Sequence, residues 1–129
     1  MLEVHLIRDA GDIVDRFAVA QLKVERIGSS ESKREFRCYF DELFTLFLMH
    51  PHLQWWSFIM ESLHYNSSIW DLESAVRKGL LDGKPKEVGR RAIEIRKLNQ
   101  LRIGVKNRVN SLVRDGFVEE KKDHISEIK

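Results

Sequence analysis

The sequence predicts an all-α protein, a compact bundle of four to five helices with a long C-terminal helix. Apolar residues recur three and four positions apart through most of the chain, which is the spacing of a helix face that packs on a core. Seven Gly and two Pro among 129 residues leave little room for long loops. This length fits a single domain. We expect its core to lie within residues 12–116, followed by a tail at residues 117–129.

The first two helices are delimited by residues that typically cap or stop a helix. The first should begin with Asp12 as its N-terminal cap and end at Gly28. The second should span residues 32–50 and end before Pro51, since proline cannot continue a helix.

The rest of the chain predicts three more helices. Two are expected over residues 52–65 and 66–81, with Ser67 or Ser68 as the cap of the second. The segment DGKPKE is the clearest loop, and the longest helix follows it, at residues 87–114.

Charge is spread unevenly along the chain, although the formal net charge is only +2. Residues 76–114 carry 12 basic and 3 acidic side chains, whereas residues 1–75 carry 7 basic and 12 acidic ones. Such asymmetry can mark a surface for anions or nucleic acid. It can also mean that an acidic helix packs beside a basic one.

Several classes of protein find no support in the sequence. We expect no membrane segment and no secretory signal. A single cysteine, Cys38, excludes an intrachain disulfide and favours the reducing cytoplasm. His50, His52 and His64 lack the spacing of a zinc site, so we expect no metal and no cofactor. No nucleophile or phosphate-loop motif occurs, so no catalytic residue is assigned and enzymatic activity stays open.

The last predicted helix raises the question of a binding site. Five apolar side chains form one band along it: Leu98, Leu101, Val105, Val109 and Leu112. Asn99, Arg102, Lys106 and Asn110 follow at the edge of that band, at spacings of three, four and four. We therefore expect a half-buried polar line, whose charges must meet acids, water or an anionic ligand.

Four charged residues on other helices are candidates to meet this line, namely Asp15, Lys23, Glu73 and Arg77. In one interpretation the eight residues surround a pocket between helices that binds an anionic, phosphate-bearing small molecule. The cations would grip the anion. The two asparagines would orient it, and Asp15 or Glu73 would hold the cations or act as a base. In the other interpretation the same residues form a structural network of ion pairs that fixes the register in which the helices pack against one another.

Two further alternatives concern macromolecular partners. If the polar line is structural, the protein could be a helical interaction module or a homodimer. Adjacent side chains on a helix point about 100° apart, so one of Trp55 and Trp56 should be core and the other a partial surface or dimer contact. A nucleic-acid partner would use exposed cations on or near the last helix: Arg90, Arg91, Arg96, Lys97, Arg108 and Arg114. These cations surround the helix instead of forming one stripe, which disfavours nucleic acid.

Four short motifs resemble those of a small family of uncharacterised helical proteins from bacteria and phages. The first motif is carried by Asp15, Arg16, Leu22, Lys23, Glu25 and Ile27. The second is carried by Asn66, Trp70, Leu72, Glu73, Val76 and Arg77. The third consists of Asn99, Arg102, Lys106, Val109 and Asn110, and the last of Glu119, Glu120 and Lys121. The resemblance implies a site at the polar line and brings no activity with it.

Overall fold

The computed structural model describes residues 8–52 and 54–114, and it is all-helical over them, with no strand. It contains four helices, namely α1 (Ala10–Arg26), α2 (Ser30–Met49), α3 (Gln54–Arg77) and α4 (Pro85–Arg114). The predicted all-α class with four to five helices is thus confirmed. None of the four helices is both long and apolar enough to cross a membrane.

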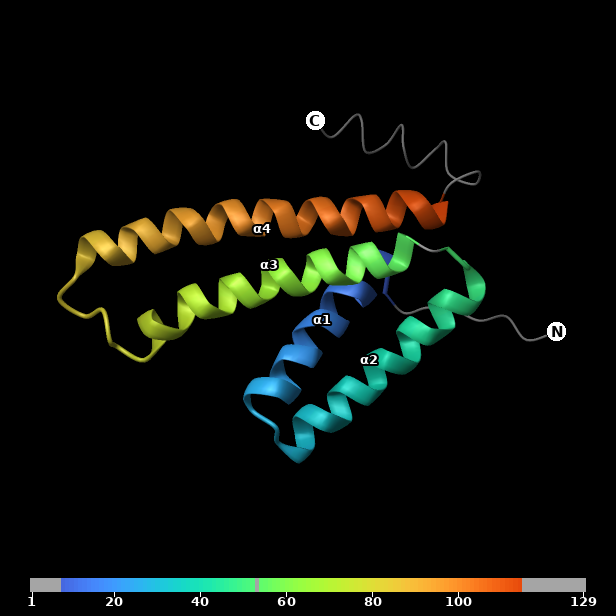
Figure 1. The fold of residues 1–129 in the computed structure, drawn as a ribbon, viewed down its shortest axis with the longest axis horizontal. Helices are drawn as coiled ribbons and strands as arrows, with labels where there is room; N and C mark the ends of the chain where they lie inside the picture. Colours follow the sequence, from blue (N-terminus) through green and yellow to red (C-terminus); the bar gives the residue numbers. More distant parts are fainter. Residues whose placement is uncertain (1–7, 53, 115–129) are drawn as a thin grey trace.

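α1 is the helix around which the others are arranged. It contacts α2, α3 and α4, while α3 and α4 also pair with each other. Figure 1 shows α3 and α4 side by side along the long axis of the molecule, with α1 and α2 projecting from one half of that pair. A site between α1 and its neighbours is therefore built from segments far apart in the sequence.

α1 begins earlier than the sequence predicted. Its N-terminal cap is Asp9, whose side chain accepts a hydrogen bond from the backbone N–H of Asp12 at 2.8 Å. Asp12 lies in the first turn, where a carboxylate still favours the helix N-terminus. At the other end the chain reverses at Gly28, whose φ of +70° is readily adopted only by glycine.

The prediction of two helices over residues 52–81 was wrong, because α3 runs through the expected break. Asn66 does not open a new helix. Its side-chain amide donates to the carbonyl oxygen of Ser62, one turn earlier, at 2.9 Å. Ser67 and Ser68 are half-buried within the helix. The chain leaves α3 at Gly79, which has a φ of +74°.

α4 starts at Pro85, a residue suited to the first turn because its missing N–H has no partner there. The structure describes α4 as far as Arg114. The predicted tail at residues 117–129 and the motif at residues 119–121 lie outside the described residues.

The core lies where α1 meets the other three helices. Its buried apolar side chains come from all four helices: Ala10, Ile13, Val14, Leu43, Leu46, Trp55, Phe58, Ile59, Val105 and Val109. Of the band predicted on the last helix, Val105 and Val109 are buried, whereas Leu101 is 49% exposed. α4 therefore packs on the core mainly through its second half.

Candidate functional site

The polar line on α4 is half-buried, as its spacing predicted. Asn99, Arg102, Lys106 and Asn110 are all of intermediate exposure. Three of them contact α1 directly, and Asn99 accepts a hydrogen bond from Nη1 of Arg102 at 3.2 Å. The line therefore lies along the contact between α1 and α4.

Asp15 is the acid that meets Arg102. Its side chain is 7% exposed, and Oδ1 lies 3.0 Å from Nε of Arg102. That Nε makes no hydrogen bond, so this contact is mainly one of opposite charge. Oδ1 also accepts a hydrogen bond from the buried amide of Asn66 on α3 at 3.0 Å. This cluster joins α1, α3 and α4.

The other two polar residues secure the start of α1. Nζ of Lys106 lies 3.6 Å from a carboxylate oxygen of Asp12. Oδ1 of Asn110 accepts a hydrogen bond from the backbone N–H of Gly11 at 2.8 Å. This N–H is among those that a helix leaves without an internal partner, and here α4 supplies that partner.

The structure does not bring the eight predicted residues into one site. Glu73 and Arg77 lie near the C-terminal end of α3, where they pair with each other at 3.4 Å. Lys23 pairs with Glu35 of α2 at 3.2 Å. The five others, Asp15, Asn99, Arg102, Lys106 and Asn110, lie at the contact between α1 and α4.

Two clefts result, and Lys23 lines both of them. The first, of about 410 Å³, lies over the α1–α4 contact. It is lined by Asp12, Asp15, Arg16, Val19, Lys23, Glu35, Tyr39, Arg102 and Lys106. Four cations there face three carboxylates, so little positive charge is left for a ligand.

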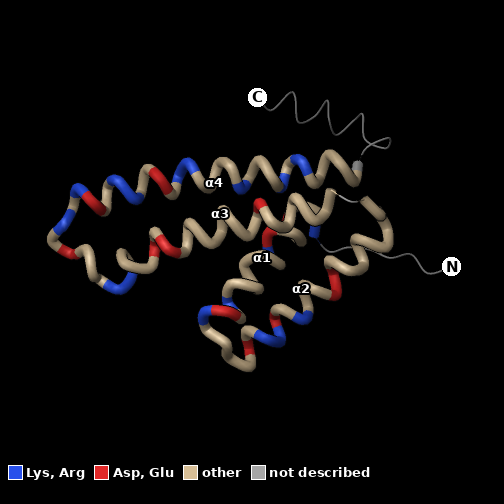
Figure 2. The backbone as a smooth tube through the Cα atoms, in the orientation of Figure 1, with Lys and Arg blue, Asp and Glu red and all other residues tan. Residues whose placement is uncertain are grey.

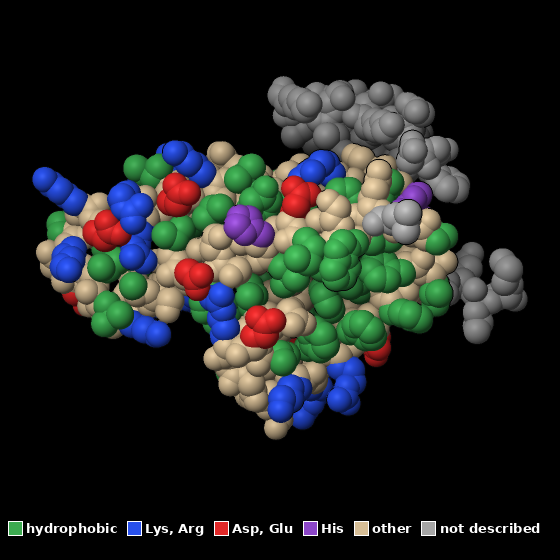
Figure 3. All heavy atoms as spheres, in the orientation of Figure 1, with side chains coloured by type: hydrophobic (Ala, Val, Ile, Leu, Met, Phe, Trp, Pro, Cys, Tyr) green, Lys and Arg blue, Asp and Glu red, His purple; other side chains and the backbone are tan. Residues whose placement is uncertain are grey.

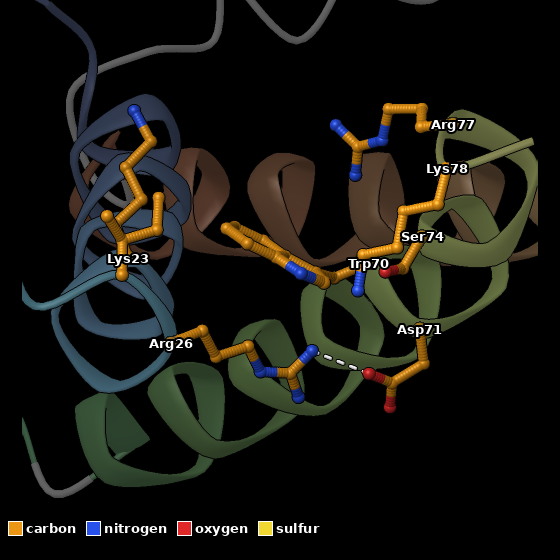
Figure 4. A pocket seen from close by; sticks show the side chains of 8 residues that line it. Lys23, Arg26, Trp70, Asp71, Ser74, Arg77 and Lys78 are labelled. Carbon is orange, nitrogen blue, oxygen red and sulfur yellow. Dashed lines mark hydrogen bonds and ion pairs between the residues drawn. The ribbon is translucent and has the colours of Figure 1, made fainter.

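The second cleft, of about 740 Å³, lies between the end of α1 and the second half of α3, and we name it the Trp70 cleft. It is lined by Lys23, Arg26, Ile27, Trp70, Asp71, Ser74, Arg77 and Lys78. Four cations there face one carboxylate. Figure 4 shows the Trp70 side chain extending from α3 towards Lys23.

The Trp70 indole is flanked by two guanidinium groups. The central carbon of Arg26 lies 5.6 Å from the ring centroid, and that of Arg77 lies 5.9 Å from it. Nη1 of Arg26 also lies 2.5 Å from a carboxylate oxygen of Asp71, and Nη2 donates a hydrogen bond to the Ser67 hydroxyl at 2.8 Å. Cations near an aromatic ring are attracted by its negative face. The cleft thus combines an apolar platform with positive charge.

Several of the cations that a nucleic-acid partner would use already form ion pairs with acidic side chains. Arg90 and Arg91 both hydrogen-bond to Glu87, at 2.7 and 2.9 Å. The bonds from Arg90 and then Arg91 lower the pKa of Glu87 to about 2, and the pKa of Arg90 is raised in turn. Arg108 forms a two-pronged pair with Glu61 on α3. Figure 2 shows Lys and Arg spaced along α4, with acids between them.

Sequence reasoning missed Arg26, Ser74 and Lys78 of the Trp70 cleft and Asn66 of the buried cluster. A signal for the cleft was present, because residues 70, 74, 77 and 78 fall on one side of a helix at 100° per residue. The sequence held no comparable signal for Asn66, since its partner Asp15 is 51 positions away.

Comparisons with known proteins add no relative, because no family model, no curated protein and no solved structure matches the chain. The resemblance noted from the four short motifs therefore stays an expectation.

Proposed function

We propose that the protein binds an anionic, phosphate-bearing small molecule in the Trp70 cleft. The observation that carries the proposal is the charge of the lining, in which four cations face one carboxylate. A cleft of about 740 Å³ falls within the range typical of small-molecule sites. Lys23 and Arg77 of the predicted ligand-binding set belong to it.

The roles of the lining residues follow from their chemistry. Arginine offers a planar fork that matches two oxygens of a phosphate or carboxylate, and lysine offers a point charge. Lys23, Arg26 and Arg77 have carboxylate partners, whereas no carboxylate among the described residues is paired with Lys78. Lys78 can therefore bind an anion without first giving up an ion pair. The Trp70 ring provides a flat apolar surface for the rest of the ligand.

The α1–α4 contact takes the structural role in this proposal. Its cations already have carboxylates within 3.6 Å, and Asn110 accepts a backbone hydrogen bond. Asp15, Arg102 and Lys106 would hold α1 in place, which in turn positions Lys23 and Arg26 at the cleft.

The test is a thermal-shift screen of the full chain against inorganic phosphate, pyrophosphate, nucleotides, sugar phosphates and dicarboxylates. A ligand at a hundred times its dissociation constant stabilises by about 2.7 kcal/mol. Lys78→Ala should abolish the shift, because it removes the cation without an ion-pair partner. Lys97→Ala is the matched control, since Lys97 is exposed on α4 and does not line the cleft.

Each outcome bears on the proposal. A shift that is lost in Lys78→Ala and kept in Lys97→Ala supports the Trp70 cleft and names the chemistry of its ligand. A shift lost in Arg102→Ala but kept in Lys78→Ala would move the site to the α1–α4 contact. No shift with any of these anions would contradict anion binding.

A further inference from the structure

An uncharged segment runs from the end of α2 into the start of α3. Residues 43–60 contain no Lys, Arg, Asp or Glu, and they include about the last third of α2 and the start of α3. In Figure 2 this segment is the long stretch without coloured charges. α2 pairs closely only with α1, so much of its surface has no neighbour in the described chain.

Large apolar side chains are exposed along this segment and just before it. Phe40, Phe44 and Leu48 follow one another at four-residue spacing on α2, with exposures of 47%, 52% and 70%. Trp56 and Met60, also four apart on α3, are 71% and 49% exposed. We call these five residues the apolar face. Figure 3 shows a broad hydrophobic area over the region where α2 and α3 lie.

A groove lies beside the apolar face and shares Phe40 and Trp56 with it. It has a volume of about 650 Å³, and nine residues line it, which are Phe17, Phe40, Leu43, Phe47, Pro51, His52, Trp55, Trp56 and Ile59. Trp55 is buried and anchors the floor, with Nε1 donating to the carbonyl oxygen of His50. Trp56, its neighbour, projects at the rim. The exposed Trp56 ring and the groove thus lie next to each other.

We propose that the apolar face binds a second copy of this chain, as a two-fold symmetric dimer. In such a dimer the same surface meets itself, so any net charge on it would repel its own image. Four of the five residues of the apolar face lie within residues 43–60, which carry no charged side chain, so this repulsion is absent there. Two-fold pairing can also place each Trp56 in the groove of the other copy.

The area fits a dimer contact. Five large side chains that are about half exposed, at roughly 200 Å² each, offer about 600 Å² of apolar surface. A standard interface buries about 800 Å² on each partner, and the walls of the groove supply the remainder. An apolar face of this size lies at the upper end of what monomers expose, and such faces are often functional.

This proposal is independent of the proposed function, since the groove and the Trp70 cleft share no lining residue. The test is sedimentation equilibrium of the full chain over a range of concentrations. We expect twice the monomer mass of 15.2 kDa for the parent. Trp56→Glu should return the mass to one chain, while Trp56→Phe should keep the dimer. Ile103→Glu is the control, because Ile103 is 52% exposed on α4, away from the groove.

Leu48→Glu gives a second disruption of the face from α2, should Trp56→Glu fail to fold. A circular dichroism melting curve establishes that each variant is folded. A parent that stays monomeric up to about 100 μM, where even weak dimers form, would overturn the proposal and leave the face to another protein or a lipid. A dimer that survives both Glu substitutions, or one that Ile103→Glu also dissociates, would overturn it as well.

Discussion

Replacing Gly11 by Ala is predicted to force α1 away from α4, because no side-chain atom fits between them at this point. A Cβ atom on Gly11 would lie 2.4 Å from the carbonyl oxygen of Lys106 and 2.9 Å from its carbonyl carbon and Cα. All three atoms belong to the main chain of α4. A change of rotamer therefore cannot relieve the clash, and one helix must move.

The size of the effect follows from these distances. Ordinary van der Waals contact begins near 3.4 Å, so the helices must separate locally by about 1 Å. Overpacking of this kind typically costs about 1–3 kcal/mol. The separation also weakens the hydrogen bond from the Gly11 N–H to Asn110, worth about 1 kcal/mol. The helix propensity of Ala returns less than about 1 kcal/mol. We expect a net loss of about 1–3 kcal/mol, or a fall in Tm of roughly 4–12 °C.

Thermal and urea unfolding followed by circular dichroism would measure this loss. Gly104→Ala is the matched control, because an added Cβ at this α4 position meets nothing within 4 Å. The same substitution should there raise the free energy of unfolding by up to about 1 kcal/mol. A Gly11→Ala protein as stable as the parent, or equal losses in both variants, would refute the close approach of α1 and α4.

The remaining predictions concern the ion pairs formed by Arg102 and by Glu87. Arg102→Ala should lower the free energy of unfolding by about 2–4 kcal/mol, because it leaves the buried Asp15 carboxylate without its cation. In urea unfolding, the double change with Asp15→Asn should cost less than the two single changes added together, and additivity would contradict the pairing. Glu87 has a folded pKa of about 2, below its ordinary 4.5, so its stabilisation is complete above the higher value and is lost as pH falls towards the lower one. Glu87→Gln should flatten stability against pH in that window, and an unchanged slope in urea unfolding would refute the arginine bonds.

The periodicity of apolar and polar residues predicted those features that depend on a single helix. The repeat of apolar residues is enough for the all-helical class, and the spacing of Asn99, Arg102, Lys106 and Asn110 was enough to place them at a half-buried edge. Such spacing reports the position of a side chain on its own helix. It does not say which residues of another helix lie opposite, so the pairing of Arg102 with an acid on α1 was beyond it.

The errors in the helix boundaries involve partners that are distant in the sequence. Asp9 and Asp12 are both suitable caps; the structure uses Asp9, and the N–H of Gly11, in the extra turn that this adds, is satisfied by Asn110, 99 positions along the chain. Asn66 is a residue type typical of a helix start, yet its amide donates to Ser62 within α3 and to Asp15 on α1. In both cases one of the partners comes from another helix, Asn110 of α4 or Asp15 of α1.

The cations of the Trp70 cleft also have an explanation that needs no ligand. Helix C-termini carry partial negative charge, and Lys23, Arg26 and Arg77 lie in the last turns of α1 and α3, with Lys78 directly after. This effect alone predicts that Lys78→Ala lowers the stability of the ligand-free protein by about 0.3–1 kcal/mol.

The helix-end effect does not require the two helix ends to meet at one cleft. It also does not account for the aromatic ring that lies between their arginines. The two explanations therefore differ in one observable. A helix-end role gives the parent no ligand-dependent shift, whereas the binding cleft gives a shift that disappears with Lys78.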